Sequence, residues 1–422
     1  MKTNKLLCLF CLLVPLPLIA QNPDSIITPE LKDLVEYPDD DYIYIVREGR
    51  ASMPAYSYSS ENFSVVQVNV NEFGENILGD AANEPSIAID PTNPNRMVIG
   101  WRQFDTIESN FRQAGFAYSN DGGQSWTFPG VIEPGVFRSD PVLDFDSDGN
   151  FYYNSLGTDN GFRCTVFKST GDGTWDEGTF AFGGDKQWMV IDRTGGQGHG
   201  NIYSFWAQSF SICSPGFFTR SWDGGFSYEE CNVIPNPLRR GTLSVGPDGA
   251  LYACGHVGTE FYVAKSTNAQ DSTQTLTWDF TSNVFLDGEL ERAAGPNPAG
   301  MLGQVWIATD HSGTSTHGNV YLLCSVKRFS TSDVLDVMFS RSTDGGLTWS
   351  APIRINDDYE PNAWQWFGTL SVAPNGRIDV AWVDTRDDPG GLNSALYISH
   401  SEDGGLTWTA NEQLSESFDP CL

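Results

Sequence analysis

The side chains that could perform chemistry in this chain are a pair of carboxylates and a set of cationic and aromatic residues. Asp140 and Asp185 lie about one repeat apart, and two carboxylates can split a glycosidic bond, one as acid and one as base or nucleophile. Side chains at related positions could bind a charged or sugar ligand: Arg102, Lys186, Arg240, Arg292, Trp366 and Arg386. Sequence spacing does not set the distances between these residues, so the elements that carry them decide whether a site forms.

One acidic segment has the residue order of a calcium-binding loop. Asp144, Asp146 and Asp148 alternate before Gly149, in the D-x-D-x-D-G order. The glutamate that would complete an EF-hand is absent, and the corresponding segments 246–249 and 373–376 read as plain turns. We therefore interpret the segment as a turn, with a bound calcium ion as the alternative, and expect no other cofactor.

The elements that must position these residues are marked by an eight-residue motif, S-x-D-G-G-x-[ST]-[WY]. Four complete copies occupy residues 119–126, 221–228, 342–349 and 401–408, and weaker copies occupy 169–175 and 266–278. The closing aromatic residues recur at steps of roughly 50 residues, which is the length of one four-stranded propeller blade. Asp followed by glycine favours a turn, so we expect the motif carboxylates to be structural: Asp121, Asp172, Asp223, Asp344 and Asp403.

Strand-like segments surround each motif. They are rich in β-branched and aromatic residues and bounded by Gly, Pro and Asp. Six such units predict an all-β, six-bladed β-propeller that occupies residues 63–422. The strand-like segment 63–70 precedes the first unit. It could close the ring by pairing with the last blade, or it could belong to a seven-bladed propeller whose last blade is incomplete.

Composition and the N-terminal residues indicate an exported protein. Residues 1–20 have the charged start and apolar core of a signal peptide, and residues 21–62 form an acidic leader. With 54 acidic against 24 basic residues, the net charge of −30 argues against nucleic acid or an anionic membrane as a partner. No other segment predicts a membrane span, and we expect a secreted, extracellular or periplasmic monomer.

The cysteines permit disulfides in such a compartment. Cys213 and Cys231 flank one motif hairpin and could bridge adjacent strands. Buried thiols are the alternative that the sequence leaves open.

The repeated motif resembles the Asp-box, or BNR, repeat of secreted propellers of the sialidase superfamily. The resemblance covers the six motif segments and implies that the boxes lie away from the ligand. It places the ligand at the opposite end of the central channel, where the candidate residues would converge. It implies a glycan or glycoprotein partner and, for an enzyme, glycoside hydrolysis of the sialidase type.

One position departs from the sialidase pattern. Sialidases carry an arginine just before the innermost strand of the first blade, whereas residues 83–86 of this chain place Glu84 there. A non-catalytic propeller that binds a glycan or a protein therefore remains the alternative to a hydrolase.

Overall fold

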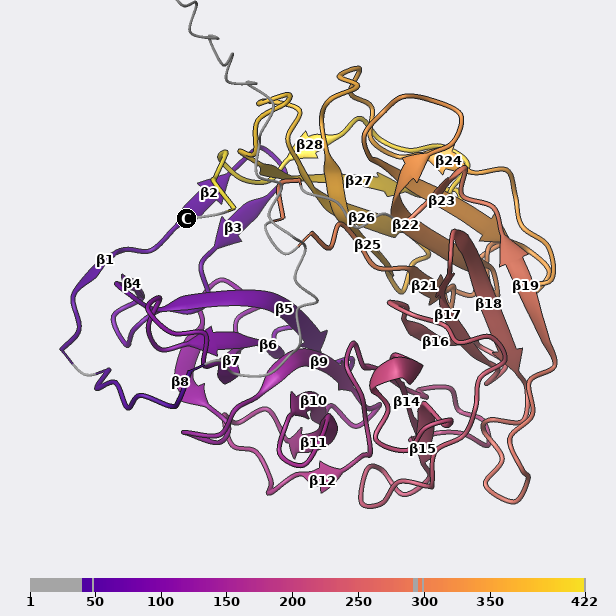
Figure 1. Cartoon of the computed structure of the whole chain (residues 1–422), viewed down its shortest axis with the longest axis horizontal. Helices are drawn as coiled ribbons and strands as arrows, with labels where there is room; N and C mark the ends of the chain where they lie inside the picture. The colour runs from indigo at the N-terminus through magenta and orange to yellow at the C-terminus, as the bar shows by residue number, and fades with distance from the viewer. Residues whose placement is uncertain (1–39, 48, 291–294, 298–299, 421–422) are drawn as a thin grey trace, which may run out of the picture.

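The computed structural model describes residues 40–47, 49–290, 295–297 and 300–420. The expected signal peptide, residues 1–20, and part of the expected leader lie outside these residues. Six β-sheets follow one another around a central axis in chain order (Figure 1), so the predicted six-bladed propeller is confirmed. We number the blades 1 to 6 along the chain.

Each blade is an antiparallel sheet built from consecutive strands. Blade 1 contains β5 (Ala81–Ile89), β6 (Met97–Phe104), β7 (Gln113–Ser119) and β8 (Thr127–Val131). Blade 2 contains β9 (Ser139–Phe145), β10 (Phe151–Gly157), β11 (Arg163–Ser169) and β12 (Thr179–Phe180). Blade 3 contains β13 (Trp188–Ile191), β14 (Ile202–Phe205) and β15 (Phe218–Ser221).

The second half of the ring repeats this arrangement. Blade 4 contains β16 (Leu243–Val245), β17 (Leu251–Val257), β18 (Glu260–Ser266) and β19 (Phe280–Val284). Blade 5 contains β21 (Trp306–Thr309), β22 (Val320–Arg328), β23 (Asp336–Ser342) and β24 (Ile353–Arg354), and β20 (Gly288–Glu289) pairs with the end of β22. Blade 6 contains β25 (Gln365–Val372), β26 (Ile378–Asp384), β27 (Ala395–Ser401) and β28 (Glu412–Gln413).

Blade 3 lacks a regular fourth strand, and a disulfide holds its outer edge. Asn232 forms a single antiparallel bridge with Phe218 where the other blades have a strand. Cys231, next to it, is bonded to Cys213. The expected disulfide at this hairpin is thus confirmed, whereas Cys164, Cys254 and Cys324 are buried thiols.

Hydrophobic cores between neighbouring blades hold the ring together. Five clusters of buried side chains join blade 1 to 2, 2 to 3, 3 to 4, 4 to 5 and 5 to 6. Between blades 1 and 2, for example, Phe116 packs with Tyr153 and Phe167. Aromatic burial on this scale is the main source of stability in such a fold.

The junction between blades 6 and 1 is built differently. Among the described residues, no buried cluster joins these two blades, and Ile87 and Ile89 on the innermost strand of blade 1 are 50% and 39% exposed. Two small sheets lie on this side of the ring (Figure 1). One pairs β1 (Ser52–Pro54) with β4 (Glu75–Ile77), and the other pairs β2 (Ser57–Ser59) with β3 (Ser64–Val66).

The segment 63–70 therefore does not add a strand to the last blade. It pairs with β2 instead, and the hairpin reaches blade 6 through side chains. Ser60 Oγ and Asn62 Nδ2 donate hydrogen bonds to the Glu412 carboxylate, at 2.5 and 3.0 Å.

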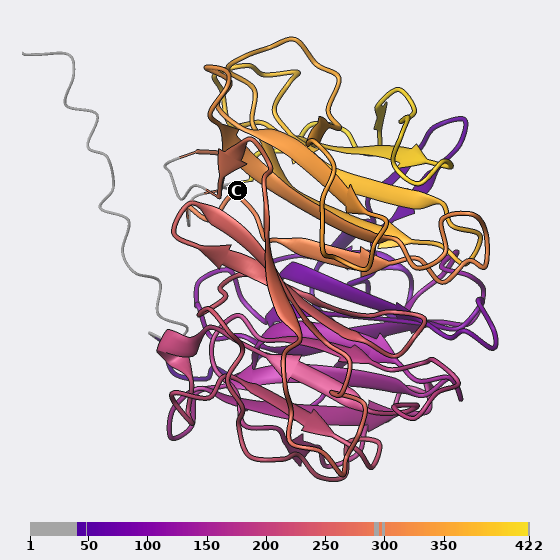
Figure 2. The same cartoon turned by 90° about the vertical axis from the view of Figure 1, so that its right-hand side faces the viewer.

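The alternating strand directions give the propeller two distinct ends, seen from the side in Figure 2. The Asp-boxes join third to fourth strands and lie at one end, which we call the box end. The loops that join second to third strands, and each blade to the next, lie at the other, which we call the loop end. The described residues include no helix long and apolar enough to cross a membrane; a single 3-10 turn occupies Gln208–Phe210.

Candidate functional site

The innermost strands begin at the loop end with a repeated backbone distortion. Five residues there have left-handed φ angles between 45° and 59°: Glu84, Asp140, Lys186, Arg240 and Phe367. The pairing of the first two strands skips register beside this position in blades 1, 2 and 6, as a β-bulge does. Non-glycine residues rarely adopt this conformation, and such strain clusters at functional sites.

The two predicted carboxylates share one lysine at this end. Lys186 Nζ lies 3.0 Å from Asp140 Oδ2 and 3.4 Å from Asp185 Oδ1. Burial alone would raise the pKa of Asp140, but the charges of Lys186 and Arg102, with hydrogen bonds from Lys186 and Ser139, hold that pKa well below its usual value. Asp140 is therefore a permanent carboxylate, suited to stabilising charge and unsuited to donating a proton.

The neighbouring cations are also engaged with the protein. Arg102 Nη2 lies 3.1 Å from Glu84 Oε1, and Arg102 Nε donates to Asn83 Oδ1 at 2.8 Å. Arg240 is half-buried, and its charge acts on the His256 imidazole. Burial, together with the charges of Arg240 and its neighbour, lowers the pKa of that imidazole.

Two further predicted ligand residues are placed differently or not described. Trp366 is 8% exposed and packs with Leu302 and Leu335, and its indole N–H donates to Ser394 Oγ at 3.4 Å. Its ring is thus covered by protein, which leaves little surface for a sugar. Arg292 lies outside the described residues.

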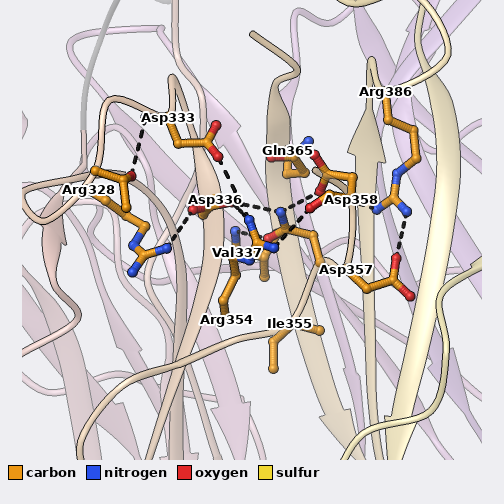
Figure 3. Close-up of polar contacts among 12 residues, drawn as sticks. Arg328, Asp333, Asp336, Val337, Arg354, Ile355, Asp357, Asp358, Gln365 and Arg386 are labelled. Carbon is orange, nitrogen blue, oxygen red and sulfur yellow. Dashed lines mark hydrogen bonds and ion pairs between the residues drawn. The ribbon is translucent and has the colours of Figure 1, made fainter. Parts of the chain in front are cut away.

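Arg386 belongs to a second group of charges, between blades 5 and 6 at the loop end (Figure 3). We call this group the acidic cluster and define it by nine residues: Arg328, Asp333, Asp336, Arg354, Asn356, Asp357, Asp358, Asp384 and Arg386. The predicted convergence of all the candidates on one point is thus not observed. Asp140, Asp185 and Lys186 meet near the axis, and Arg386 contributes to a separate cluster.

Four strands and the loops beside them supply the acidic cluster, with Arg328 on β22, Asp336 on β23, Arg354 on β24 and Asp384 on β26. Arg354 Nη1 on β24 lies 3.5 Å from Asp336 Oδ1 and 3.8 Å from Asp333 Oδ2. Asn356 Nδ2 donates to Asp336 Oδ1 and Asp358 Oδ1, at 2.7 Å each. Arg328 and Arg386 flank this centre through further ion pairs, Arg328 with Asp336 at 3.1 Å and Arg386 with Asp358, Asp357 and Asp384 at 3.8, 2.9 and 2.8 Å.

Three oxygens of this region are buried without a hydrogen-bond partner: Asp333 Oδ1, Asp358 Oδ2 and Gln365 Oε1. Burial and the negative charges of Asp336 and Asp358 raise the pKa of Asp333 to about 6, against the opposing charge of Arg354. A carboxyl group that keeps its proton to this pH can act as a general acid. The cluster therefore combines one carboxyl group of raised pKa with carboxylates held by guanidinium groups.

Four carboxylates of the cluster, Asp333, Asp336, Asp357 and Asp358, were not predicted from the sequence. Asp333 lies in the loop between the second and third strands of blade 5, whereas Arg102 lies within β6, the second strand of blade 1. Asp357 and Asp358 follow the fourth strand of blade 5, where the chain passes to blade 6. The sequence did place Asp333 and the pair Asp357–Asp358 in two connections at the same end of blade 5. Only the fold shows that these side chains meet.

The segment with the residue order of a calcium-binding loop is held by internal contacts. Asp144 pairs with Arg193 at 2.6 Å, although burial still raises the pKa of Asp144. Asp146 accepts bonds from the backbone N–H groups of Asp148 and Asn150, at 3.0 and 2.9 Å. Asp148 is exposed. Within the described part of the chain, no group of three or more acidic, His or Cys side chains could hold a metal ion.

The Asp-boxes repeat one set of hydrogen bonds at the other end of the molecule. In the third complete box, Asp344 Oδ1 accepts from Ser342 Oγ and from the Thr348 backbone N–H, at 2.8 and 2.9 Å. Thr348 Oγ1 donates to Asp344 Oδ2 at 2.5 Å. The same contacts recur around Asp121, Asp223 and Asp403, and Asp172 accepts both bonds of Thr174.

The stretched sixth box keeps two of these contacts with a different residue. Asn268 Oδ1 accepts from Ser266 Oγ at 3.2 Å and from the Thr277 N–H at 2.9 Å. An asparagine thus occupies the place of the aspartate, and the extra residues form a separate turn between the two contacts.

Comparisons with known proteins give distant relatives. The chain matches no known protein-family model. It is 26% identical over 81% of its length to a probable oligoxyloglucan-reducing end-specific xyloglucanase of Neosartorya fischeri, and 23% identical over 85% to the corresponding enzyme of Emericella nidulans. These matches cover 35% and 38% of the two relatives, so the chain spans little more than a third of their length.

Solved structures of similar shape include a sialidase from a Hadza microbial source. It has a TM-score of 0.47 and 15% identity, with 72% of this chain and 63% of the sialidase covered. The chain is thus an Asp-box-like β-propeller with distant sequence similarity to oligoxyloglucan-reducing end-specific xyloglucanases.

Proposed function

We propose that this protein is a glycan-active propeller that hydrolyses a glycosidic bond at the loop end, beside the acidic cluster. The observation that carries the proposal is Asp333, whose pKa is raised to about 6 among carboxylates and guanidinium groups. Glycosidases use such a pair of environments, with one carboxyl protonated and another charged. Asp333 would donate the proton to the leaving oxygen, and Asp336 or Asp358 would act as the second carboxylate.

The distant relatives support a glycan as the ligand, and the activity in their names suggests xyloglucan oligosaccharides as the first substrates to test. Near the axis, Arg102, Lys186 and Arg240 remain predicted ligand contacts. The disulfide between Cys213 and Cys231 supports an exported protein, since disulfides persist in oxidising compartments.

The test is hydrolysis of a panel of xyloglucan oligosaccharides, arabinan fragments and a sialoside by the wild type and Asp333→Asn. Removal of a general acid should lower kcat by about 100-fold or more. Asp344→Asn in a box provides a matched control and should keep its activity per folded molecule. An active wild type with an equally active Asp333→Asn variant would exclude Asp333 as the acid.

A non-catalytic glycan- or protein-binding propeller is the second candidate. It is favoured by Glu84, which stands where sialidases place an arginine and which pairs with Arg102 at 3.1 Å. Specific binding without hydrolysis across the same panel would select this candidate.

A further inference from the structure

A cavity of about 270 Å³ opens at the loop end between blades 4 and 5, outside the acidic cluster. Its walls come from the turn between β17 and β18, the end of β19, the segment before β20 and the loop after β22. The lining combines aromatic and polar residues, among them Phe285, Phe329, Glu260, Asn283 and Thr259.

Two phenylalanine rings on this cavity are left in contact with water. Phe285 is 58% exposed and Phe329 is 57% exposed. Single exposed rings occur elsewhere on the molecule, but these two line the same cavity and together offer an apolar surface that a ligand can cover. Ligand sites commonly combine apolar walls of this kind with a few fixed polar groups.

The polar wall of the cavity is held in place by hydrogen bonds. Tyr262 O–H donates to Glu260 Oε2 at 2.8 Å, and Asn283 Nδ2 donates to Glu260 Oε1 at 3.3 Å. A fixed carboxylate accepts hydrogen bonds from hydroxyl groups and repels anions. Together with the net charge of −30, it favours a neutral, hydroxyl-rich ligand over a sialic or uronic acid.

The cavity is directly connected to the acidic cluster. Arg328 lies 3.0 Å from Asp287 and 3.1 Å from Asp336, and the Phe329 backbone N–H donates to Asp287 O at 2.7 Å. Gly288 permits this approach, because a Cβ there would lie 2.5 Å from the Lys327 carbonyl oxygen. A glycan bound at the acidic cluster could therefore extend along the edge of the cavity to Phe285 and Phe329.

We propose that this cavity is a subsite for one neutral sugar ring of a glycan chain, which stacks on Phe285 and Phe329 and donates hydroxyl hydrogen bonds to Glu260. The inference rests on the proposed function, because the position of the glycan follows from bond cleavage at the acidic cluster. It adds the ligand class and a dependence on chain length that the cluster alone does not require.

The test measures binding by calorimetry for neutral xyloglucan and cellulose oligosaccharides of increasing length, with the wild type and Phe285→Ala/Phe329→Ala. Removal of both rings should weaken binding of the longest oligosaccharides about tenfold, the usual effect of truncating an aromatic side chain in a binding site, and should leave the shortest bound ligand unchanged. Phe226→Ala is the matched control, since Phe226 is an exposed ring at the box end; it should change neither. Phe285→Tyr/Phe329→Tyr should restore tight binding.

Several outcomes would overturn the subsite. These are equal binding of all lengths by wild type and the double alanine variant, tighter binding of anionic than neutral oligosaccharides, or no binding of any neutral oligosaccharide by the wild type. The proposed function fails separately, because binding that depends on the two rings without any hydrolysis would retain the subsite and exclude the catalytic assignment.

Discussion

Aspartates at the two ends of this propeller have opposite properties. At the box end, Asp344 is surrounded by N–H and O–H donors from its own turn, and these outweigh the effect of burial and lower its pKa to about 2. At the loop end, burial and two neighbouring carboxylates raise the pKa of Asp333 to about 6. Local donors stabilise the charged form of the first carboxyl group, and long-range packing favours the protonated form of the second. The same side chain thus stabilises one end and can perform chemistry at the other.

The largest expected effect concerns the pH dependence of hydrolysis. Because Asp333 must be protonated to act as an acid, activity should be present below its pKa of about 6 and should fall about tenfold per pH unit above it. The measurement is kcat/KM of the wild type from about pH 4 to about pH 8. Asp333→Asn should lose most of its activity, and its remaining kcat/KM should no longer fall above about pH 6. The same fall in that variant would contradict the assignment of Asp333 as the acid.

A smaller effect is expected at the box end. Asp344→Ala removes the acceptor of four hydrogen bonds, so the free energy of unfolding should fall by about 1–3 kcal/mol. Denaturant unfolding measures this change, with Glu402→Ala, an exposed acidic residue of another box, as the control. Since the folded pKa is lowered, the stabilisation should be present above about pH 4 and be lost as pH falls through about 2. Loss of activity with unchanged stability would contradict a structural role.

The smallest expected effect is an increase in the free energy of unfolding, opposite to the decrease expected at the box end. A raised folded pKa means that the native state holds a proton that the unfolded chain gives up, so ionised Asp333 disfavours folding above about pH 6. Asp333→Asn should then raise the free energy of unfolding at about pH 7.5 by about 1 kcal/mol, a value reduced for solvent screening because the carboxyl is partly exposed. The gain should disappear near pH 3, where both states are protonated. Denaturant unfolding at these two pH values gives the answer, and a loss of stability at pH 7.5 would show that Asp333 is a structural anion like Asp344.

The box end could be predicted from the sequence because its interactions are local. Asp344 and its donors lie within seven residues of one another in the motif, so the turn and its hydrogen bonds follow from the repeat itself, and six repeats favour six blades. The pairing of Cys213 with Cys231 was also within reach, since both flank one hairpin. Local interactions persist even in the sixth box, because Asn268 preserves two of the contacts across an insertion that makes the motif hard to recognise.

The loop end depended on tertiary structure. Asp333 and Asp358 come from different connections of blade 5, and no sequence spacing brings them to Arg354. The prediction that Trp366 faces a ligand followed from its position at an inner strand, yet the adjacent Phe367 has the left-handed backbone and Trp366 turns into the core. A one-residue shift in a bulge decides which side chain faces the channel.

The sequence by itself determined the all-β class, the six repeats and the turns that join the outer strands, because each depends on residues close together in the chain. Only the tertiary structure decided which charges meet at the loop end, which carboxyl keeps its proton and how blades 6 and 1 are joined. These properties depend on burial and on distances between segments far apart in sequence, and the electrostatic energy of a buried charge is set by neighbours that local patterns do not specify.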